Sequence, residues 1–396
     1  MRASLYLRRA TLALLAAGAL LATAGAGAET LAIGYLELED DPRYVEERVE
    51  AYYQGRPWGR PYPGAEVALS ESRFAAAAAG AELELRRVTA ADAEDLFAQM
   101  QKLHETGVRF FLVDTPGPVT AELARRSAEL PLLLFNVSAL DDALRQESCQ
   151  AHLLHIAPSH RMLQDALAQY LVSVKWRRVL ALVGPQQGDK AIYQSFQTSA
   201  KRYGLRISEA RDFVLGTDPR QRSRNNVALL TTGEYDVVYV ADARGEFARA
   251  VPYQTQKPRV TAGSAGLVPD WWHWAFERYG APQLNSRFIK QADRRMTGYD
   301  WSAWMGVKAI AEAVLRTGGT DFEALRDYLR GDELVLDGFK GNRLSFRAWD
   351  NQLRQPIMLT TPNWVIGLAP IEGFLHQTNN LDTLGQDERE SRCEFD

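Results

Sequence analysis

Short apolar segments alternate with helix-forming segments along nearly the whole chain, and this alternation limits the fold more than any other feature. Strands that are joined by helices through short connections lie parallel in a sheet, and the helices then cover both faces of that sheet. The segments interpreted as strands are 31–38, 81–88, 108–114, 130–137, 152–158, 177–184, 205–213, 236–242 and 258–263. The segments interpreted as helices are 68–80, 92–105, 119–128, 159–174, 189–203, 270–293, 300–316 and 322–330. The sequence therefore predicts an α/β protein.

The pattern stops after residue 137 and starts again at 152, which divides the chain into two similar halves. A chain of 396 residues is also longer than one hydrophobic core usually supports. We therefore expect two lobes, each a parallel sheet with helices on both faces, hinged by crossover segments. The first lobe is assigned residues 29–140 plus about 295–333, and the second lobe residues 141–294 plus about 334–375. Residues 343–375 are interpreted as two or three strands, and 376–396 as a C-terminal tail.

Residues 1–28 have the three parts of a secretory signal peptide. Arg2, Arg8 and Arg9 give a basic start, residues 10–23 are apolar and small, and Ala26-Gly27-Ala28 has the small-x-small pattern of a cleavage site. The apolar part is too short for a retained membrane anchor. No cysteine follows it, so the sequence offers no site for lipid attachment. These features predict a periplasmic protein without a lipid anchor.

The charge of the chain limits the class of partner. The formal net charge is −4 and becomes more negative when the three arginines of the signal peptide are removed. A mildly acidic protein is a poor general binder of nucleic acid or of anionic membranes. Affinity for an anion must therefore come from a local cluster of arginine and lysine, and we expect no nucleic-acid partner.

Cys149 and Cys393 are the two cysteines of the chain. In an oxidising compartment an even number of cysteines favours a disulfide. This disulfide would tie the C-terminal tail to the segment before the second half. The alternative is two unpaired thiols, which the oxidising compartment disfavours.

Several segments together carry a family resemblance. They are IGYLEL, GAEVALSE, FFLVDTPGP, LFNVSAL, HIAPSHRMLQDALAQYL, VLALVGPQQGDKAIYQSF and GYDWSAWMGVKAIAEAV. In their order and spacing they resemble the type I periplasmic solute-binding proteins of ABC transporters, the leucine/isoleucine/valine-binding class. The resemblance implies a small-molecule ligand between two hinged lobes and an inner-membrane permease as partner. It also implies a monomer that has no enzymatic activity and no catalytic cofactor.

A narrower resemblance concerns the nature of the ligand. The segments GLVPDWWHWAFERYGAPQLNSRF, MTGYDWSAW and SRCEF look like a branch associated with quinoprotein alcohol oxidation, which is similar to binders of pyrroloquinoline quinone. The chain departs from ordinary amino-acid binders in an additional segment, residues 40–64, between the first strand and the first helix. This segment speaks against a small amino-acid ligand.

The additional segment contains the first group of candidate ligand-binding residues: Arg56, Trp58, Arg60 and Tyr62. Pyrroloquinoline quinone is a flat tricycle with three carboxylates, which needs rings to stack on and cations to pair with. Tryptophan and tyrosine supply the rings, and arginine can donate two bonds to one carboxylate. The alternative is a surface loop whose aromatic side chains cover the edge of a lobe.

Further candidates follow the predicted strands, because ligands of parallel sheets bind beyond the carboxyl ends of the strands. These candidates are Asp114, Thr115, Asn136, Ser138, Ser159 and Gln187. Their alternative role is to cap turns and helices. Trp272 and Trp301 are candidates for the cleft from the tryptophan-rich segments, although most tryptophans there would pack in the core.

Catalysis and metal binding find no support in the sequence. There is no Gly-x-Ser-x-Gly motif, no P-loop and no Gly-x-Gly-x-x-Gly motif, so no catalytic residue is assigned. His152 and His155 would point to opposite faces of a strand, which disfavours a metal site. The competing hypotheses are a binder of an amino acid or another small organic acid, a periplasmic sensor subunit, and a secreted enzyme on the same scaffold.

Overall fold

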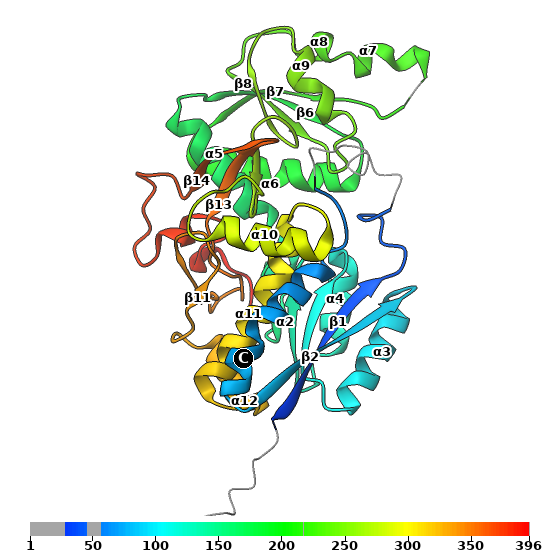
Figure 1. The fold of residues 1–396 in the computed structure, drawn as a ribbon. Coiled ribbons are helices and arrows are strands. Elements are labelled where there is room, and N and C mark those ends of the chain that lie inside the picture. The colour runs from blue at the N-terminus through cyan, green and yellow to red at the C-terminus, as the bar shows by residue number, and fades with distance from the viewer. Residues whose placement is uncertain (1–27, 46–56, 217, 396) are drawn as a thin grey trace, which may run out of the picture.

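The computed structural model describes residues 28–45, 57–216 and 218–395, and it contains two parallel sheets, as the sequence predicts (Figure 1). The first sheet has the strand order β2-β1-β3-β4-β5. Its strands are β1 (Glu29–Leu38), β2 (Ala81–Ala90), β3 (Phe110–Asp114), β4 (Leu133–Asn136) and β5 (Leu153–His155). The second sheet has the order β7-β6-β8-β9. Its strands are β6 (Arg178–Val183), β7 (Arg206–Asp212), β8 (Val237–Ala241) and β9 (Val260–Gly263).

Helices cover both faces of the first sheet because alternate residues of its strands point to opposite sides. Phe110 and Leu112 of β3 pack in one cluster with α2 and α11, whereas Phe111 and Val113 pack in another with α3 and α4. The helices around this sheet are α2 (Tyr62–Ala78), α3 (Ala93–Glu105), α4 (Gly117–Arg126), α11 (Gly298–Thr317) and α12 (Phe322–Arg330). Thr297 and Asp300 form a reciprocal cap at the start of α11.

The second sheet is covered in the same way. Val237 and Tyr239 of β8 pack with α5 and α6, whereas Val238 and Val240 pack with α8 and α9. The helices of this region are α5 (His160–Ser173), α6 (Gln187–Tyr203), α7 (Arg222–Asn225), α8 (Val227–Leu230) and α9 (Val251–Gln254). The two sheets lie at opposite ends of the molecule in Figure 1. The exact lobe boundaries remain a prediction.

The strand at 152–158 is assigned to the second lobe by the sequence, and the structure corrects this assignment. Its ordered part, β5, pairs in parallel with β4 and becomes the edge strand of the first sheet. The apolar pattern identifies a strand but not its partner. The chain therefore crosses to the second sheet after β5 rather than before it.

The prediction of a continuous helix over 270–293 is wrong. Residues Val268–Asp270 form the short strand β10, and only Ala281–Ala292 form a helix, α10. The carboxylate of Asp270 accepts the backbone N–H groups of Trp271 and Trp272, which competes with helical hydrogen bonds. Gly280, with φ of 85°, then begins α10.

A small antiparallel sheet contains the strands predicted within 343–375. Its order is β10-β13-β14, with β13 (Ile357–Thr361) and β14 (Trp364–Ala369) joined as a hairpin. A separate pair is formed by β11 (Leu336–Asp337) and β12 (Arg343–Leu344). Helix α5 contacts β10, β13 and β14, so this small sheet packs against the second half of the chain.

A buried arginine holds the crossover segments together. The Arg145 guanidinium donates to the carbonyl oxygens of Ala139, Asp141 and Ala157 at 2.7–3.0 Å and to Gln352 Oε1 at 2.9 Å. Burial lowers its pKa to about 10. One side chain therefore links the first crossover to the segment that precedes β13.

The C-terminal tail is tied to the body of the protein at several points. The predicted disulfide between Cys149 and Cys393 is present, with a Cα–Cα distance of 5.8 Å. Arg347 Nε donates to Asp382 Oδ1 at 2.8 Å, and both side chains are fully buried. Arg202 of α6 donates to the carbonyl oxygen of Gly385 at 2.7 Å. The tail thus contacts both a crossover and the helices of the second sheet.

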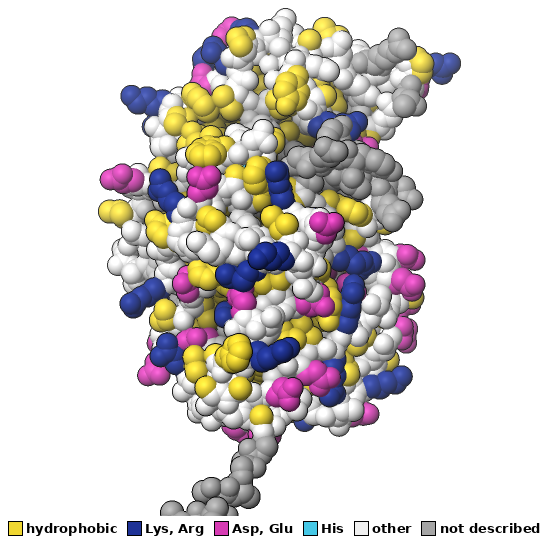
Figure 2. Space-filling view, in the orientation of Figure 1, with side chains coloured by type: hydrophobic (Ala, Val, Ile, Leu, Met, Phe, Trp, Pro, Cys, Tyr) yellow, Lys and Arg dark blue, Asp and Glu magenta, His cyan; other side chains and the backbone are white. Residues whose placement is uncertain are grey.

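The signal peptide assigned to residues 1–28 lies, apart from Ala28, outside the described residues. In the ranges that the structure describes, no helix is both long and apolar enough to cross a membrane. Acidic and basic side chains are interspersed over the face shown in Figure 2, with no single basic patch there.

Candidate ligand-binding site

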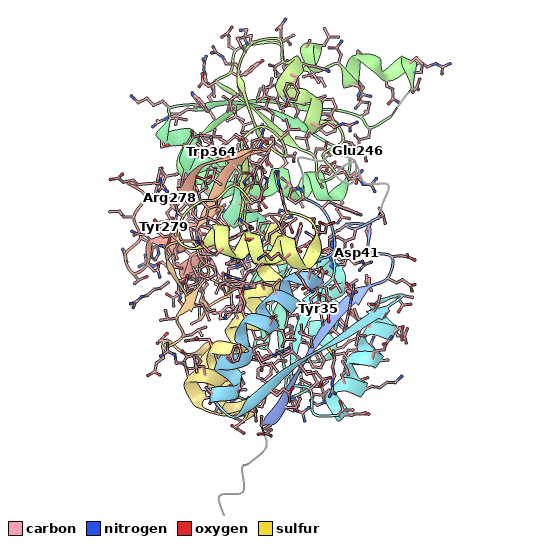
Figure 3. The ribbon with its side chains drawn as sticks, in the orientation of Figure 1. Tyr35, Asp41, Glu246, Arg278, Tyr279 and Trp364 are labelled. Atoms are coloured by element: carbon pink, nitrogen blue, oxygen red, sulfur yellow. A yellow bond between two sulfur atoms is a disulfide. The ribbon has the colours of Figure 1, made fainter. Side chains whose placement is uncertain are left out.

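The candidate site is built around Asp114, at the carboxyl end of β3. Its carboxylate is fully buried and accepts three hydrogen bonds from side chains of the neighbouring β1 region. Tyr35 Oη donates to Oδ2 at 3.2 Å, Tyr44 Oη donates to Oδ1 at 2.9 Å, and Arg43 Nη2 lies 3.0 Å from Oδ1. Asp114 therefore joins the end of β3 to the loop that follows β1. Tyr35 and Asp41, which are labelled in Figure 3, show where this region lies in the molecule.

Arg43 is positioned by a second carboxylate, Asp41. Its Nε lies 3.0 Å from Oδ1 and its Nη2 lies 2.6 Å from Oδ2. This two-point pairing fixes the plane of the guanidinium. The third nitrogen, Nη1, is buried and has no hydrogen-bond partner among the residues that the structure describes. One donor of Arg43 is therefore unused.

Burial is the largest influence on Asp114 and raises the pKa of its carboxyl, although Arg43 and the Ser138 hydroxyl act in the opposite direction. Ser138 follows β4 and is buried. Its Oγ lies near Asp114 but makes no hydrogen bond of normal length to a described residue. Ser138 thus adds a second unused polar group beside the same carboxylate.

Asn136 shapes the loop that carries Ser138. Its Oδ1 accepts the N–H groups of Ser138 at 3.2 Å and Ala139 at 2.8 Å, and its Nδ2 donates to the carbonyl oxygen of Ala139. These bonds use most of the hydrogen-bonding capacity of the Asn136 amide, so the role of Asn136 is to position the loop. Thr115 is also buried, and its hydroxyl pairs with that of Thr120 at 2.8 Å, which closes the turn into α4.

The described part of the additional segment folds back onto the end of β1. Arg60 Nη1 lies 3.2 Å from Glu37 Oε2 and 2.8 Å from the carbonyl oxygen of Leu38. Trp58 Nε1 donates to the carbonyl oxygen of Arg43 at 3.4 Å. The ring of Tyr62 lies edge-on to that of Tyr35, with centroids 5.0 Å apart. The prediction for Arg56 falls outside the described residues.

The junction between α10 and α11 contacts this segment. Arg294 donates to both oxygens of Asp300 at 2.7 Å and to the carbonyl oxygen of Arg60 at 2.8 Å. Gly59 has φ of 143°, and a Cβ there would lie 2.7 Å from Arg294 Nε. The segment around Gly59 therefore lies directly against this junction.

The next residue, Arg295, lies over Trp274, with its guanidinium carbon 3.5 Å from the ring centroid. Trp274 is half-buried, and its Nε1 is a buried donor with no partner in the ranges that the structure describes. Beside it, Trp271 packs edge-on to Tyr299 with centroids 5.0 Å apart. Arginine and aromatic side chains thus come together at this end of α11.

Four predicted residues lie elsewhere or are already engaged. Ser159 caps α5 by accepting the Met162 N–H at 3.1 Å, and Gln187 is exposed at the start of α6. Trp272 and Trp301 are buried and stacked, with centroids 6.2 Å apart. Their Nε1 atoms donate to Asn285 and to the carbonyl oxygen of Gly338. The structure places these two indoles in the core.

Sequence reasoning missed Tyr35, Asp41, Arg43, Tyr44 and Arg295. The rule that ligands bind beyond the carboxyl ends of strands points to the loop after β1, and Asp41 and Arg43 lie there. No comparable signal marks Arg295, because its contact with Trp274 depends on the irregular path of residues 271–280.

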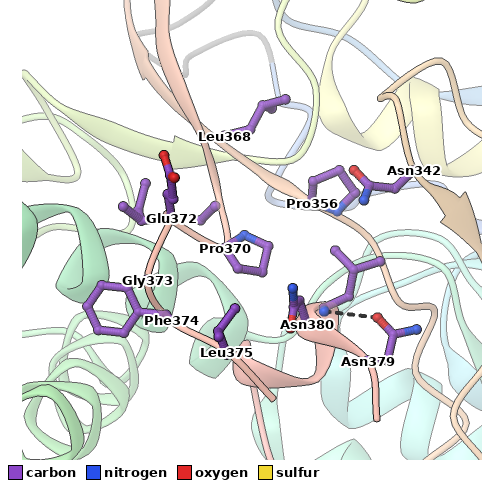
Figure 4. Close-up of a pocket in the computed structure, with 13 residues that line it drawn as sticks. Asn342, Pro356, Leu368, Pro370, Glu372, Gly373, Phe374, Leu375, Asn379 and Asn380 are labelled. Atoms are coloured by element: carbon purple, nitrogen blue, oxygen red, sulfur yellow. Dashed lines mark hydrogen bonds between the residues drawn. The ribbon is translucent and has the colours of Figure 1, made fainter. Parts of the chain in front are cut away.

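A cavity of about 280 Å³ lies between the end of β14 and the tail (Figure 4). Its walls are mainly apolar, with Asn342, Asn379 and Asn380 as amides and Glu372 as a carboxylate. None of the lining residues belongs to the Asp114 cluster, and none is a cation. It is therefore poorly suited to an anionic ligand. Among the described residues no group of three potential metal ligands occurs.

Comparisons with known proteins identify solved structures that share this fold. No protein-family model matches the chain, and no curated protein matches it by sequence. A periplasmic binding protein from Burkholderia mallei is 16% identical with a TM-score of 0.65, covering 93% of this chain and 99% of its own. A branched-chain amino acid ABC transporter periplasmic ligand-binding protein from Burkholderia xenovorans is 12% identical with a TM-score of 0.68, covering 92% and 99%.

This chain has the fold of the two-lobed periplasmic binding proteins. A third structure with the same fold is a solute-binding protein of an ABC transporter from Rhodopseudomonas palustris in complex with 3,4-dihydroxybenzoic acid. It is 12% identical, has a TM-score of 0.62, and covers 84% of this chain and 93% of its own. Fold alone does not determine the ligand.

Proposed function

We propose that this protein is the periplasmic solute-binding protein of an ABC transport system and that it binds a flat aromatic carboxylate between its lobes. Pyrroloquinoline quinone is the preferred ligand. The ligand would enter an open cleft, and closure of the lobes would give the form that an inner-membrane permease recognises. The fold supports the class of protein, and the chemistry of the Asp114 region supports the class of ligand.

One observation carries the choice of an anionic ligand. Two buried polar groups beside Asp114, Arg43 Nη1 and Ser138 Oγ, and a third at the start of α11, Trp274 Nε1, have no hydrogen-bond partner among the described residues, and each of them can donate. A buried donor without a partner costs about 1–3 kcal/mol. A ligand that brings acceptor oxygens would remove this cost, whereas one that brings only donors would not.

The aromatic character of the ligand is supported by the rings around these donors. Trp58, Trp274 and Tyr299 are half-buried and come from three separate segments. Indole and phenol rings offer flat surfaces on which another ring can stack. The Rhodopseudomonas palustris protein has the same fold and holds an aromatic carboxylate. Pyrroloquinoline quinone has a flat ring system, three carboxylates and quinone oxygens, which would match both rings and donors.

The same contacts favour binding over catalysis. Asp114 is paired with Arg43, and Glu37 is paired with Arg60 and Arg87. A carboxylate held in this way is a poor general base, because its charge and lone pairs are engaged. An amino-acid ligand is also less favoured, because Asp114 is already paired with the cation of Arg43. The carboxylate would therefore gain little from the ammonium group of such a ligand.

The test is titration of the purified mature protein with pyrroloquinoline quinone, followed by tryptophan fluorescence and melting temperature. Saturable quenching and a raised melting temperature are expected, with leucine unable to displace the ligand. Absence of both changes at saturating quinone would contradict the proposed ligand. Displacement by leucine would instead support an amino-acid binder.

Ser138→Ala gives a sharper version of this test. Because Ser138 Oγ makes no hydrogen bond of normal length to a described residue, its loss should lower quinone affinity about tenfold, whereas the free energy of unfolding without ligand should stay the same or rise, since a buried polar group without a partner is removed. The matched control is Ser173→Ala, which removes an exposed hydroxyl from α5 and should change neither quantity.

A further inference from the structure

We propose that Arg295 and Trp274 form a subsite for one carboxylate of the ligand, distinct from the donors around Asp114. This inference rests on the proposed function and specifies it further. It assigns the second carboxylate of a ligand that carries at least two.

The geometry of the pair leaves the guanidinium free to bind. A distance of 3.5 Å from the guanidinium carbon to the ring centroid requires the two planes to lie nearly flat against each other. The N–H groups of the guanidinium then point outward in its own plane rather than into the indole. This is the orientation in which arginine donates two parallel bonds to a carboxylate.

The charge around Arg295 distinguishes it from the other arginines of the region. Arg43, Arg60 and Arg294 each have a carboxylate partner within 3.2 Å. Arg295 makes no hydrogen bond or ion pair through its side chain with any described residue, although it is half-buried. A partly buried cation without a counter-ion is unfavourable unless something else supplies the negative charge.

A second, independent observation also indicates a ligand here. Trp274 Nε1 is shielded from solvent and has no acceptor in the described part of the chain. His273, the neighbouring residue, supplies none, because its Nδ1 already accepts the N–H of Ala275. The indole N–H and the guanidinium are therefore both unused donors belonging to one stacked pair. A single carboxylate would supply both the charge and the acceptor oxygens.

The experiment compares probes that differ in the number of carboxylates. Isothermal titration of the mature protein would use 3,4-dihydroxybenzoate with one carboxylate, terephthalate with two, and pyrroloquinoline quinone with three. Arg295→Gln should weaken the binding of the quinone and terephthalate by about 10- to 100-fold, the range expected for a charge-assisted pair. The affinity for 3,4-dihydroxybenzoate should change less than about twofold.

Two variants separate the subsite from a structural role. Arg295→Lys keeps the charge but loses the flat fork, so it should recover only part of the affinity for the quinone. Arg278→Gln is the matched control, because Arg278 is exposed on the same loop and its loss changes the net charge equally (Figure 3). This control should bind all three probes like the wild type, and all variants should melt as single cooperative transitions.

The outcomes distinguish the two proposals. If the probes bind but Arg295→Gln weakens all three equally or none of them, the subsite is refuted while the proposed function stands. If no probe binds the wild-type protein at millimolar concentration, the proposed function fails, and the subsite fails with it.

Discussion

Arg43 Nη2 lies 3.0 Å from Asp114 Oδ1, and this ion pair ties the loop after β1 to the end of β3. The carboxylate is fully buried, and the side chain of Arg43 is 20% exposed. The pair sits where the ends of the parallel strands converge, so it shapes the surface on which a ligand would rest. Its first role is therefore to hold the candidate site in place.

Arg43→Met should destabilise the protein by about 2–4 kcal/mol, because it leaves Asp114 buried without a cation. Urea unfolding at pH 7 would measure the change. The double variant Arg43→Met with Asp114→Asn should recover at least about 1 kcal/mol of that loss. Arg125→Met removes a surface pair in which the arginine is 67% exposed, and it should cost less than about 1 kcal/mol. Equal losses of unfolding free energy for Arg43→Met and Arg125→Met would mean that the buried ion pair contributes no more to stability than the exposed one.

Gly64 allows α2 to approach the start of α11, and Gly64→Ala should prevent this approach. An added Cβ would lie 2.1 Å from the carbonyl oxygen of Asp300, which is backbone and cannot rotate away. We expect a loss of about 1–3 kcal/mol in unfolding free energy. Gly319→Ala is the control, since no atom lies within 4 Å of its added Cβ and the change should stay below about 0.5 kcal/mol.

Loss of the Cys149–Cys393 bond should lower the melting temperature. The bond closes a loop with a sequence separation of 244 residues, and closing so long a loop restricts the unfolded chain strongly. The expected loss is about 2–5 kcal/mol, measured with and without reductant. The variant with both cysteines replaced by serine should melt like the reduced wild type and should not respond to reductant. A response to reductant in that variant would contradict this explanation.

His273 should make the fold less stable in mild acid. Burial, assisted by Arg295, lowers its pKa to about 4, whereas an unfolded histidine has a pKa of about 6.5. As the pH falls below 6.5 the unfolded chain takes up the proton first, so stability decreases between pH 6.5 and 4. At pH 5 this amounts to about 2 kcal/mol. His273→Phe should therefore lose about 2 kcal/mol less than the wild type between pH 7 and pH 5 in urea unfolding. Identical losses would rule out a contribution from His273.

The two sheets could be predicted because buried parallel strands are continuous apolar segments, as in residues 108–114 and 130–137. Such a segment does not indicate which other strand it pairs with. Residues 152–158 show this clearly, since their pattern indicates a strand equally well in either sheet. The pairing of β5 with β4 places it in the first sheet, and its other edge accepts and donates hydrogen bonds with residues 351–353.

The candidate site could be predicted only where it follows the strands directly. Asp114 and Ser138 occupy positions that the carboxyl-end rule indicates, and the structure places both in one cluster. Trp272 shows why the positions of the aromatic side chains were harder to predict. Its spacing from neighbouring tryptophans resembles a helix, but Asp270 and Asn285 bind the backbone and indole N–H groups of an irregular loop. The stacking of Arg295 on Trp274 likewise depends on that loop and not on sequence spacing.

The binding of Arg145 to Gln352, together with the disulfide from Cys149 to Cys393, affects when the protein can finish folding. The first crossover is made early in synthesis, but its partners lie in the last fifty residues of the chain. The early half must therefore wait, incompletely packed, until the last fifty residues have been made and can reach it. A shortened product released before that point would lack the contacts that secure its crossover, and we expect proteases to degrade it faster than the full-length chain.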